Sequence, residues 1–155
     1  ALLIQNLYNT ILKHNGDKKV NKTSKLEKAV RFLEKRIEDL NNKESDELLW
    51  ILQHGEIYTA GTSSKQSEIL NKSIKVKITN RGGKITYHGP GKLVCYFVID
   101  LKRRKKDLRW FLKRLESVII KTLFEYNIKS FSDRKNIGIW VKQNNKNKKV
   151  AAIGL

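Results

Sequence analysis

The most unusual concentration of residues lies at positions 81–91, with the sequence RGGKITYHGPG. This window holds four of the nine glycines and the only proline of the 155-residue chain. Glycines let a ligand or a second backbone approach the main chain, and proline stiffens the turn that follows. Arg81, Thr86, Tyr87 and His88 add hydrogen-bond donors and an aromatic side chain. Together they suit a pocket for a carbonyl group or an extended chain, although glycine content alone also fits a bulged hairpin with a tight turn.

Two other kinds of site are not supported by the residues. The P-loop pattern G-x-x-x-x-G-K-[ST] fails at Gly83 and Gly89, and the dinucleotide pattern G-x-G-x-x-G fails at Val94. One cysteine and three histidines allow no internal disulfide and no cysteine-rich zinc site. We therefore expect no nucleotide cofactor, no metal, and a reducing, cytoplasmic setting.

Residues 81–94, RGGKITYHGPGKLV, resemble a signature of the lipoyl(octanoyl) transferase family, R-G-G-x-[VI]-T-[YF]-H-G-P-G-Q-[LI]-V. Residues 54–61, HGEIYTAG, resemble the family's H-P-P-V-[YF]-T-x-G segment, with Gly55 and Glu56 in place of the two prolines. Residues 149–155, KVAAIGL, resemble its K-[IV]-A-[AS]-[IL]-G-[LIV] strand. Three motifs in the family's order are far more specific than any one of them.

The resemblance implies an α+β fold like that of biotin and lipoate protein ligases, with a mixed sheet flanked by helices. It implies a single catalytic domain over residues 1–155. The reaction it implies moves an octanoyl group from octanoyl acyl carrier protein, through a cysteine thioester, onto a lysine of a lipoyl domain. The expected acceptors are the lipoyl domains of 2-oxoacid dehydrogenase complexes and the glycine cleavage H protein. We expect a monomer that uses no cofactor and binds neither nucleic acid nor membrane.

The resemblance also assigns the site residues. Lys149 stands at the position of the family's catalytic lysine. An ammonium group favours the ionised form of a nearby thiol, by roughly 4 kcal/mol at about 4 Å with an effective dielectric constant of about 20. Without the motif that follows it, Lys149 would be one more solvated lysine in a hairpin tip. The residues that would line the acyl pocket are Arg81, Gly82, Gly83, Lys84, Ile85, Thr86, Tyr87, His88, Ala152, Ile153 and Gly154.

The family's nucleophilic cysteine has no counterpart in this sequence. In the family, a P-C-G cysteine follows the strand that ends at the position of Gly154, whereas the sequence ends at Leu155. Cys95 lies in the apolar run LVCYFVI, where burial raises the pKa of a thiol, so we expect it to pack rather than react. We therefore expect a C-terminally truncated domain, either a fragment of an active enzyme or an inactive remnant.

The chain carries 33 Lys and Arg against 15 Asp and Glu, a formal net charge of +18. Such a surplus attracts polyanions at long range and would steer acidic carrier proteins to the site. A basic nucleic-acid-binding module is a less favoured alternative, because the charge is spread along the chain and no RNA-recognition or zinc-finger motif accompanies it. The other alternative is an ATP-dependent lipoate or biotin ligase relative, which would need an adenylate-binding loop that the sequence does not show.

The elements that must position these residues follow from hydrophobic periodicity. Helices are expected at residues 24–41, with Ser24 and Glu27 as a capping box, and at 107–126, capped by Asp107. The expected strands are 47–52, 56–60, 74–79, 93–99, 137–142 and 150–155. Of these, 93–99 should be a buried central strand, and the last two should form a hairpin with a polar tip at 143–149. We expect a loop at 13–23, and loop or turn positions for His14 and His54.

The longest unbroken apolar run, residues 93–99, has seven residues. A membrane-spanning helix needs about 20. The sequence therefore predicts no transmembrane segment.

Overall fold

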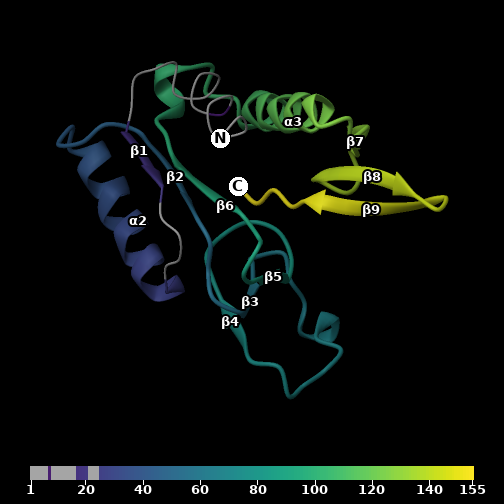
Figure 1. Ribbon diagram of the computed structural model, residues 1–155. Helices are drawn as coiled ribbons and strands as arrows, with labels where there is room; N and C mark the ends of the chain where they lie inside the picture. The colour runs from purple at the N-terminus through teal and green to yellow at the C-terminus, as the bar shows by residue number, and fades with distance from the viewer. Residues whose placement is uncertain (1–6, 8–16, 21–24) are drawn as a thin grey trace.

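The computed structural model describes residue 7, residues 17–20 and residues 25–155 (Figure 1). Its elements are β1 (Asp17–Val20), α2 (Leu26–Asn41), β2 (Leu48–Leu52), β3 (Ile57–Ala60), η2 (Gln66–Glu68), β4 (Val76–Ile78), β5 (Thr86–His88), β6 (Val94–Val98), η3 (Leu101–Arg103), α3 (Leu108–Glu125), β7 (Ser130–Ser132), β8 (Ile139–Gln143) and β9 (Lys146–Ala151). The described strands form three three-stranded sheets, in the orders β1-β2-β6, β4-β3-β5 and β7-β8-β9. The first two sheets mix parallel and antiparallel pairs. The α+β class expected from the sequence is confirmed.

Strand β2 is the centre of the core. All five of its residues are buried, as an apolar strand covered on both faces requires. Alternate side chains point to opposite faces of a strand, so Leu49 and Ile51 pack in a cluster with α3, whereas Leu48, Trp50 and Leu52 pack in a second cluster with α2. Figure 1 shows α2 and α3 on opposite sides of this strand.

The expectation of a buried central strand at residues 93–99 is wrong. Strand β6 lies at the edge of its sheet, paired antiparallel with β2, and four of its five residues are only half-buried. The apolar run at 93–99 and the run at 47–52 look alike in sequence. Their places in the sheet differ because β2 has a neighbour on each side, β1 and β6.

The two long helices begin close to where their sequences predict. Asp107 caps α3, and its Oδ1 accepts a hydrogen bond from the backbone N–H of Trp110 at 3.0 Å, which confirms that prediction. The cap residue of α2 is Lys25, which makes no side-chain cap bond, and Ser24 lies outside the described residues. The carboxylate of Glu27 accepts instead from the ammonium of Lys77, on β4.

Two expectations about the chain ends need correction. Residues 17–20, expected in a loop, form β1, which pairs parallel with β2; His14 lies outside the described residues. The β8–β9 hairpin turns at Asn144 and Asn145, both at positive φ, as in a two-residue hairpin turn. Strand β9 therefore occupies much of the expected polar tip, and it ends at Ala151 instead of Leu155.

Two short strands, β5 and β7, were not expected from the sequence. Each has only three residues, which is too short for an alternating pattern to stand out. In the structure β5 pairs with β3, and β7 pairs with β8. Among the described helices, none is both long enough and apolar enough to cross a membrane.

Replacing Ile51 by alanine should lower the free energy of unfolding by about 2–5 kcal/mol, because its fully buried side chain would leave a cavity between β2 and α3. The matched control is Leu70→Ala, at a side chain that is 96% exposed, which should change stability by less than about 0.5 kcal/mol. Denaturant unfolding followed by circular dichroism gives both values. Equal effects of the two substitutions would contradict the assignment of β2 as the core.

Candidate functional site

A glycine loop between β4 and β5 is held between two other stretches of backbone. On one side lies Gly61, just after β3, where an added Cβ would collide with the carbonyl oxygen of Gly83. On the other side lies the segment after β9: a Cβ on Gly82 would collide with the carbonyl of Leu155, and a Cβ on Gly154 would lie 2.6 Å from the carbonyl oxygen of Gly82. Only glycine permits such close approach. The three sequence motifs therefore meet at this loop.

Backbone geometry makes the same loop rigid. Gly83 has a φ of 84°, in the left-handed region that favours glycine. The backbone N–H of Thr62 donates to the carbonyl of Arg81 at 2.9 Å, and that of Ser63 donates to the carbonyl of Gly83 at 3.2 Å. The loop thus presents a fixed wall of main-chain atoms.

Among the described residues, the Arg81 guanidinium donates to neutral oxygen atoms only. Its Nη2 donates to the carbonyl (3.0 Å) and Oγ1 (2.8 Å) of Thr59 and to the carbonyl of Lys84 (2.8 Å). Its Nε donates to Thr59 Oγ1 at 3.2 Å, and its Nη1 to the carbonyl of Gly82 at 2.9 Å. Burial lowers the pKa of Arg81, yet an arginine stays charged in proteins. No carboxylate of the described residues pairs with it, so this half-buried cation favours a ligand that brings an electronegative oxygen.

Three polar side chains with aromatic rings, His54, His88 and Tyr96, form a cluster beside this cation, here called the histidine cluster. His54 is 1% exposed, its Nε2 lies 2.8 Å from the hydroxyl of Tyr96, and its ring centroid is 5.7 Å from that of His88. Nε2 of His88 lies 3.1 Å from Oγ1 of Thr59, whereas its buried Nδ1 has no hydrogen-bond partner among the described residues. Burial, together with nearby basic side chains, lowers the pKa of His88 to about 4. Burial raises the pKa of Tyr96 to about 12. Both groups are therefore uncharged at neutral pH.

His54 lies in the connection between β2 and β3, as the loop or turn prediction requires, but the prediction gave it no part in the site, whereas the residue is buried and takes part in the cluster. The position of His54 at the start of the HGEIYTAG motif was the feature of the sequence that could have indicated a place in the site. Thr59 belongs to the same motif. Tyr96 carried no such signal, because it lies within the apolar run at 93–99. Only the pairing of β6 with β2 places its hydroxyl beside His54.

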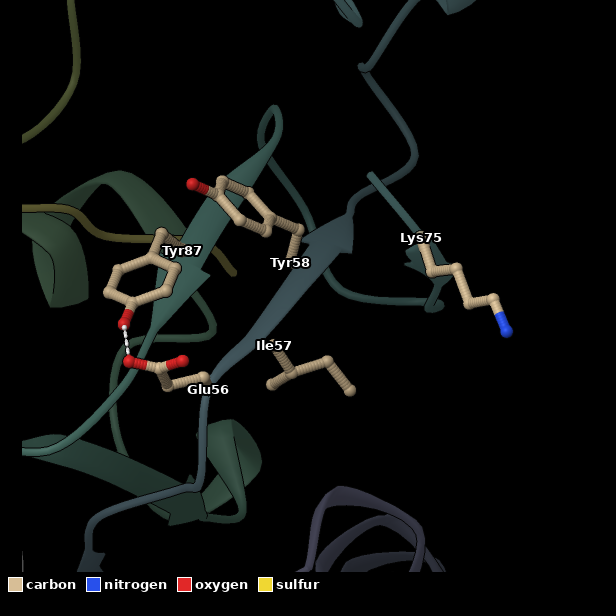
Figure 2. Close-up of a pocket in the computed structure, with 5 residues that line it drawn as sticks. All are labelled: Glu56, Ile57, Tyr58, Lys75 and Tyr87. Atoms are coloured by element: carbon tan, nitrogen blue, oxygen red, sulfur yellow. Dashed lines mark hydrogen bonds between the residues drawn. The ribbon is translucent and has the colours of Figure 1, made fainter. Parts of the chain in front are cut away.

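Strand β5 divides the expected acyl-site residues between two faces, because alternate side chains of a strand point in opposite directions. Thr86 and His88 lie on the face of the histidine cluster. Tyr87 points to the other face, where its hydroxyl donates to Glu56 Oε1 at 3.2 Å and its ring lies 5.1 Å from that of Tyr58 (Figure 2). The sequence motif therefore contributes to two distinct surfaces.

The outer surface of β3 and β5 carries a shallow pocket of its own, lined by Glu56, Ile57, Tyr58, Lys75 and Tyr87. In Figure 2 the two tyrosine rings lie side by side, and the ammonium of Lys75 points away from them. None of the lining residues belongs to the histidine cluster.

The remaining expected site residues lie around the glycine loop. The ammonium of Lys84 pairs with Glu68 on η2, and the side chain of Ile85 is half-buried. Ile153 packs against the core cluster on the α3 side, whereas Ala152 is exposed. The packing of Ile153 fixes the segment that leads to Gly154 and its contact with the loop.

Lys149 is held on the β8–β9 hairpin. Its Nζ donates to the carbonyl of Ile137 at 2.9 Å and lies 4.7 Å from the centre of the Trp140 ring. A Cβ on Gly138 would lie 3.2 Å from Cδ and Cε of the lysine, so its alkyl chain runs across that glycine. Among the described residues, the partners of this amine are the Ile137 carbonyl and the Trp140 ring. None of its interactions is with residues 81–88.

A β-bulge lies directly beside Lys149. Ile139 pairs with Ala151 and Trp140 pairs with Lys149, which leaves Val150 as the extra residue. Bulges re-aim side chains and are common next to functional sites. The bulge decides which way the lysine points relative to the segment that follows it.

Cys95 packs against the core cluster on the α3 side. Burial raises the pKa of its thiol to about 11, so the thiolate is scarce at neutral pH. The expectation that this cysteine packs is confirmed.

Substitution of Gly82 by alanine should destabilise the protein by about 1–3 kcal/mol, because the new methyl group would collide with the Leu155 carbonyl. Gly55→Ala is the matched control, since a Cβ there meets no atom within 4 Å. Denaturant unfolding measures both variants. A neutral Gly82→Ala variant would show that the loop and the segment after β9 are not in contact.

A pH dependence follows from the lowered pKa of His88. The unfolded chain gains a proton on this imidazole below about pH 6.5, whereas the folded protein resists protonation down to about pH 4. Stability contributed by the neutral imidazole should therefore be lost as the pH falls through this window. In a His88→Gln variant the stability lost between about pH 7 and pH 4.5 should be smaller than in the wild type, as measured by denaturant unfolding at both values. Identical losses would exclude a buried, neutral His88.

Comparison with known proteins places this geometry in a family. The model of the lipoyl protein ligase A/B catalytic domain matches residues 8–155. The octanoyltransferase of Ehrlichia ruminantium (strain Gardel) is 44% identical over 131 residues, which cover 83% of this chain and 63% of that protein. The octanoyltransferase of Wolbachia sp. subsp. Brugia malayi (strain TRS) is 42% identical over 128 residues, which cover 82% of this chain and 62% of that protein. The chain spans less than two thirds of the length of these relatives.

Solved structures agree on the fold. A lipoate-protein ligase A bound with ATP has a TM-score of 0.51 at 11% identity, over 84% of this chain and 54% of that one. At so low an identity the likeness concerns the fold alone, and it confirms the lipoate-ligase-like architecture expected from the motifs. With its three motifs joined at one glycine loop and the family model matched from residue 8 to residue 155, the chain belongs to the lipoyl protein ligase A/B catalytic-domain family.

Proposed function

We propose that the complete protein is an octanoyltransferase that moves an octanoyl group from octanoyl acyl carrier protein to a lysine of a lipoyl domain. The observation that carries the proposal is the meeting of Gly61, Gly82 and Gly154, which joins three motifs of the octanoyltransferase signature in one place. The names of the relatives at 44% and 42% identity support the same activity.

The reaction has two acyl-transfer steps. A cysteine thiolate attacks the thioester carbonyl of the octanoyl carrier protein, and the phosphopantetheine thiolate leaves. The neutral ε-amine of the lipoyl-domain lysine then attacks the new thioester, an amide forms, and the cysteine leaves as a thiolate while the amine loses a proton. Neither step consumes a nucleotide.

The acyl chain would lie along the wall made by Gly82, Gly83 and the segment from Ala152 to Gly154. The cation of Arg81 and the uncharged His88 adjoin this wall and would face the polar end of the acyl group. Negative charge builds on the carbonyl oxygen as either nucleophile adds, and a fixed cation stabilises it without reorganisation. Lys84, Ile85, Thr86 and Tyr87 complete the motif around the loop, with Tyr87 on the outer face.

Lys149 would supply the ammonium that favours the thiolate. Its amine has three donors, and one hydrogen bond engages it in the described structure, so it can pair with a sulfur anion. The burial of Cys95, which raises the pKa of its thiol to about 11, argues against this residue as the nucleophile. The proposal therefore requires a thiol from outside these 155 residues.

The acceptors we propose are the lipoyl domains of 2-oxoacid dehydrogenase complexes and the glycine cleavage H protein. Acyl carrier protein is the donor. Both kinds of carrier are acidic, and the net charge of +18 would speed their encounter with the site at low salt.

The direct test incubates the complete protein with octanoyl acyl carrier protein and an apo lipoyl domain, with and without ATP. We expect the octanoyl mass to appear on the lipoyl lysine at the same rate in both reactions. Absence of transfer by the wild type would refute the proposal. Transfer from free octanoate that depends on ATP would indicate a ligase instead.

Lys149→Ala in the complete protein should slow octanoyl transfer by about 100-fold or more, because the thiol would lose the cation that favours its ionised form. The matched control is Lys148→Ala, at the neighbouring exposed lysine of β9, which points to the other face of the strand and should leave the rate within about twofold. Single-turnover acylation of the cysteine, followed by mass spectrometry, measures both. Equal rates for the two variants would remove Lys149 from the mechanism.

A further inference from the structure

Thr59 lies between the cation of Arg81 and the histidine cluster. It is in β3 and is 1% exposed. Its hydroxyl oxygen is contacted by Arg81 Nη2 at 2.8 Å, Arg81 Nε at 3.2 Å and His88 Nε2 at 3.1 Å. The carbonyl of Thr86 lies at 3.5 Å, at the limit of a hydrogen bond. A buried hydroxyl with these neighbours connects the fixed cation to the imidazole.

Counting protons fixes the direction of each bond. A guanidinium has donors and no acceptor, so Arg81 can only donate to the Thr59 oxygen. It does so through Nε–H and through Nη2, whose two N–H groups are shared between Thr59 Oγ1 and the carbonyl oxygens of Thr59 and Lys84. The hydroxyl has one hydrogen left to donate. His88 Nε2 is the nearer acceptor, 3.1 Å away against 3.5 Å for the Thr86 carbonyl. The hydrogen therefore points to Nε2, which must then carry no proton of its own.

We propose that Thr59 is a positioning residue: its hydroxyl, oriented by two donors of Arg81, hydrogen-bonds to Nε2 of His88 and keeps that imidazole neutral with its proton on Nδ1. The neutral state agrees with the environment, because a protonated imidazole would place a third donor against an oxygen that already accepts from Nε and Nη2 of Arg81. The nearby His54 and Lys92 also disfavour a positive charge on this ring.

This tautomer gives the site a specific donor. Nδ1 of His88 is buried and has no hydrogen-bond partner among the described residues. A buried N–H without an acceptor is unfavourable, so it favours a ligand that brings one. If the proposed function holds, that acceptor is the carbonyl oxygen of the octanoyl group, and Thr59 sets which nitrogen meets it.

The tautomer can be observed directly by nitrogen-15 NMR of the histidine side chains in the complete protein. In the wild type we expect the Nδ1–H form of His88 to be the major tautomer, in excess of the Nε2–H form. Thr59→Val, which keeps the shape and removes the hydroxyl, should abolish this excess, and Thr59→Ser should restore it. Thr79→Val is the control, since that hydroxyl donates to the carbonyl of Ala60 and should leave His88 unchanged.

The proposal is overturned if His88 in the wild type carries its proton on Nε2, or if Thr59→Val folds and leaves the tautomer unchanged. Should Thr59→Val fail to fold, the wild-type and Thr59→Ser spectra still decide, because both must show the Nδ1–H form. The NMR result needs no acyl transfer. Loss of the proposed octanoyltransferase activity would therefore leave it standing, and an incorrect tautomer would leave the activity standing.

Discussion

Close contacts between main-chain segments at three glycines hold this site together. Gly61, Gly82 and Gly154 come from segments that follow β3, precede β5 and follow β9, and each contact is too close for a Cβ atom. The second and third sheets are thus joined through their backbones. Ile153 adds the link to the first sheet, because it packs against the core on the α3 side. A glycine loop that looks like a flexible turn in sequence is the rigid junction of the three sheets.

The charge balance at this junction differs from that of the rest of the surface. The chain carries a net charge of +18, and several of its lysines pair with carboxylates, yet no carboxylate of the described residues meets Arg81. Carbonyl and hydroxyl dipoles surround the guanidinium instead, and the neighbouring His88 and Tyr96 are uncharged at neutral pH. The cluster therefore holds one fixed positive charge among oriented dipoles, an arrangement that suits a carbonyl oxygen on which negative charge develops.

The amine of Lys149 is positioned by a different device. A bulge at Val150 shifts the register of the hairpin, and the lysine then lies over Trp140 with its amine on the carbonyl of Ile137. The ring face and the carbonyl together hold the amine in place. Rigid backbone contacts thus build the wall of the site, whereas a hairpin side chain brings the ammonium. The two parts are connected through the short segment from Ala152 to Gly154.

The spacing of residues along the sequence predicted the positions of the two long helices, the Asp107 cap and most strands, and it revealed the three motifs. Caps and periodicity depend on residues a few positions apart, so they can be read without the fold. The sequence also indicated that a ligand or a second backbone would approach the glycine loop closely. Long-range strand pairing sets three further features: residues 93–99 lie at a sheet edge, His54 is buried, and Tyr87 points to the outer face of β5. Those features depend on which distant strand pairs with each segment. A shift of one residue in the pairing would turn the side chains of a strand to the opposite face of the sheet.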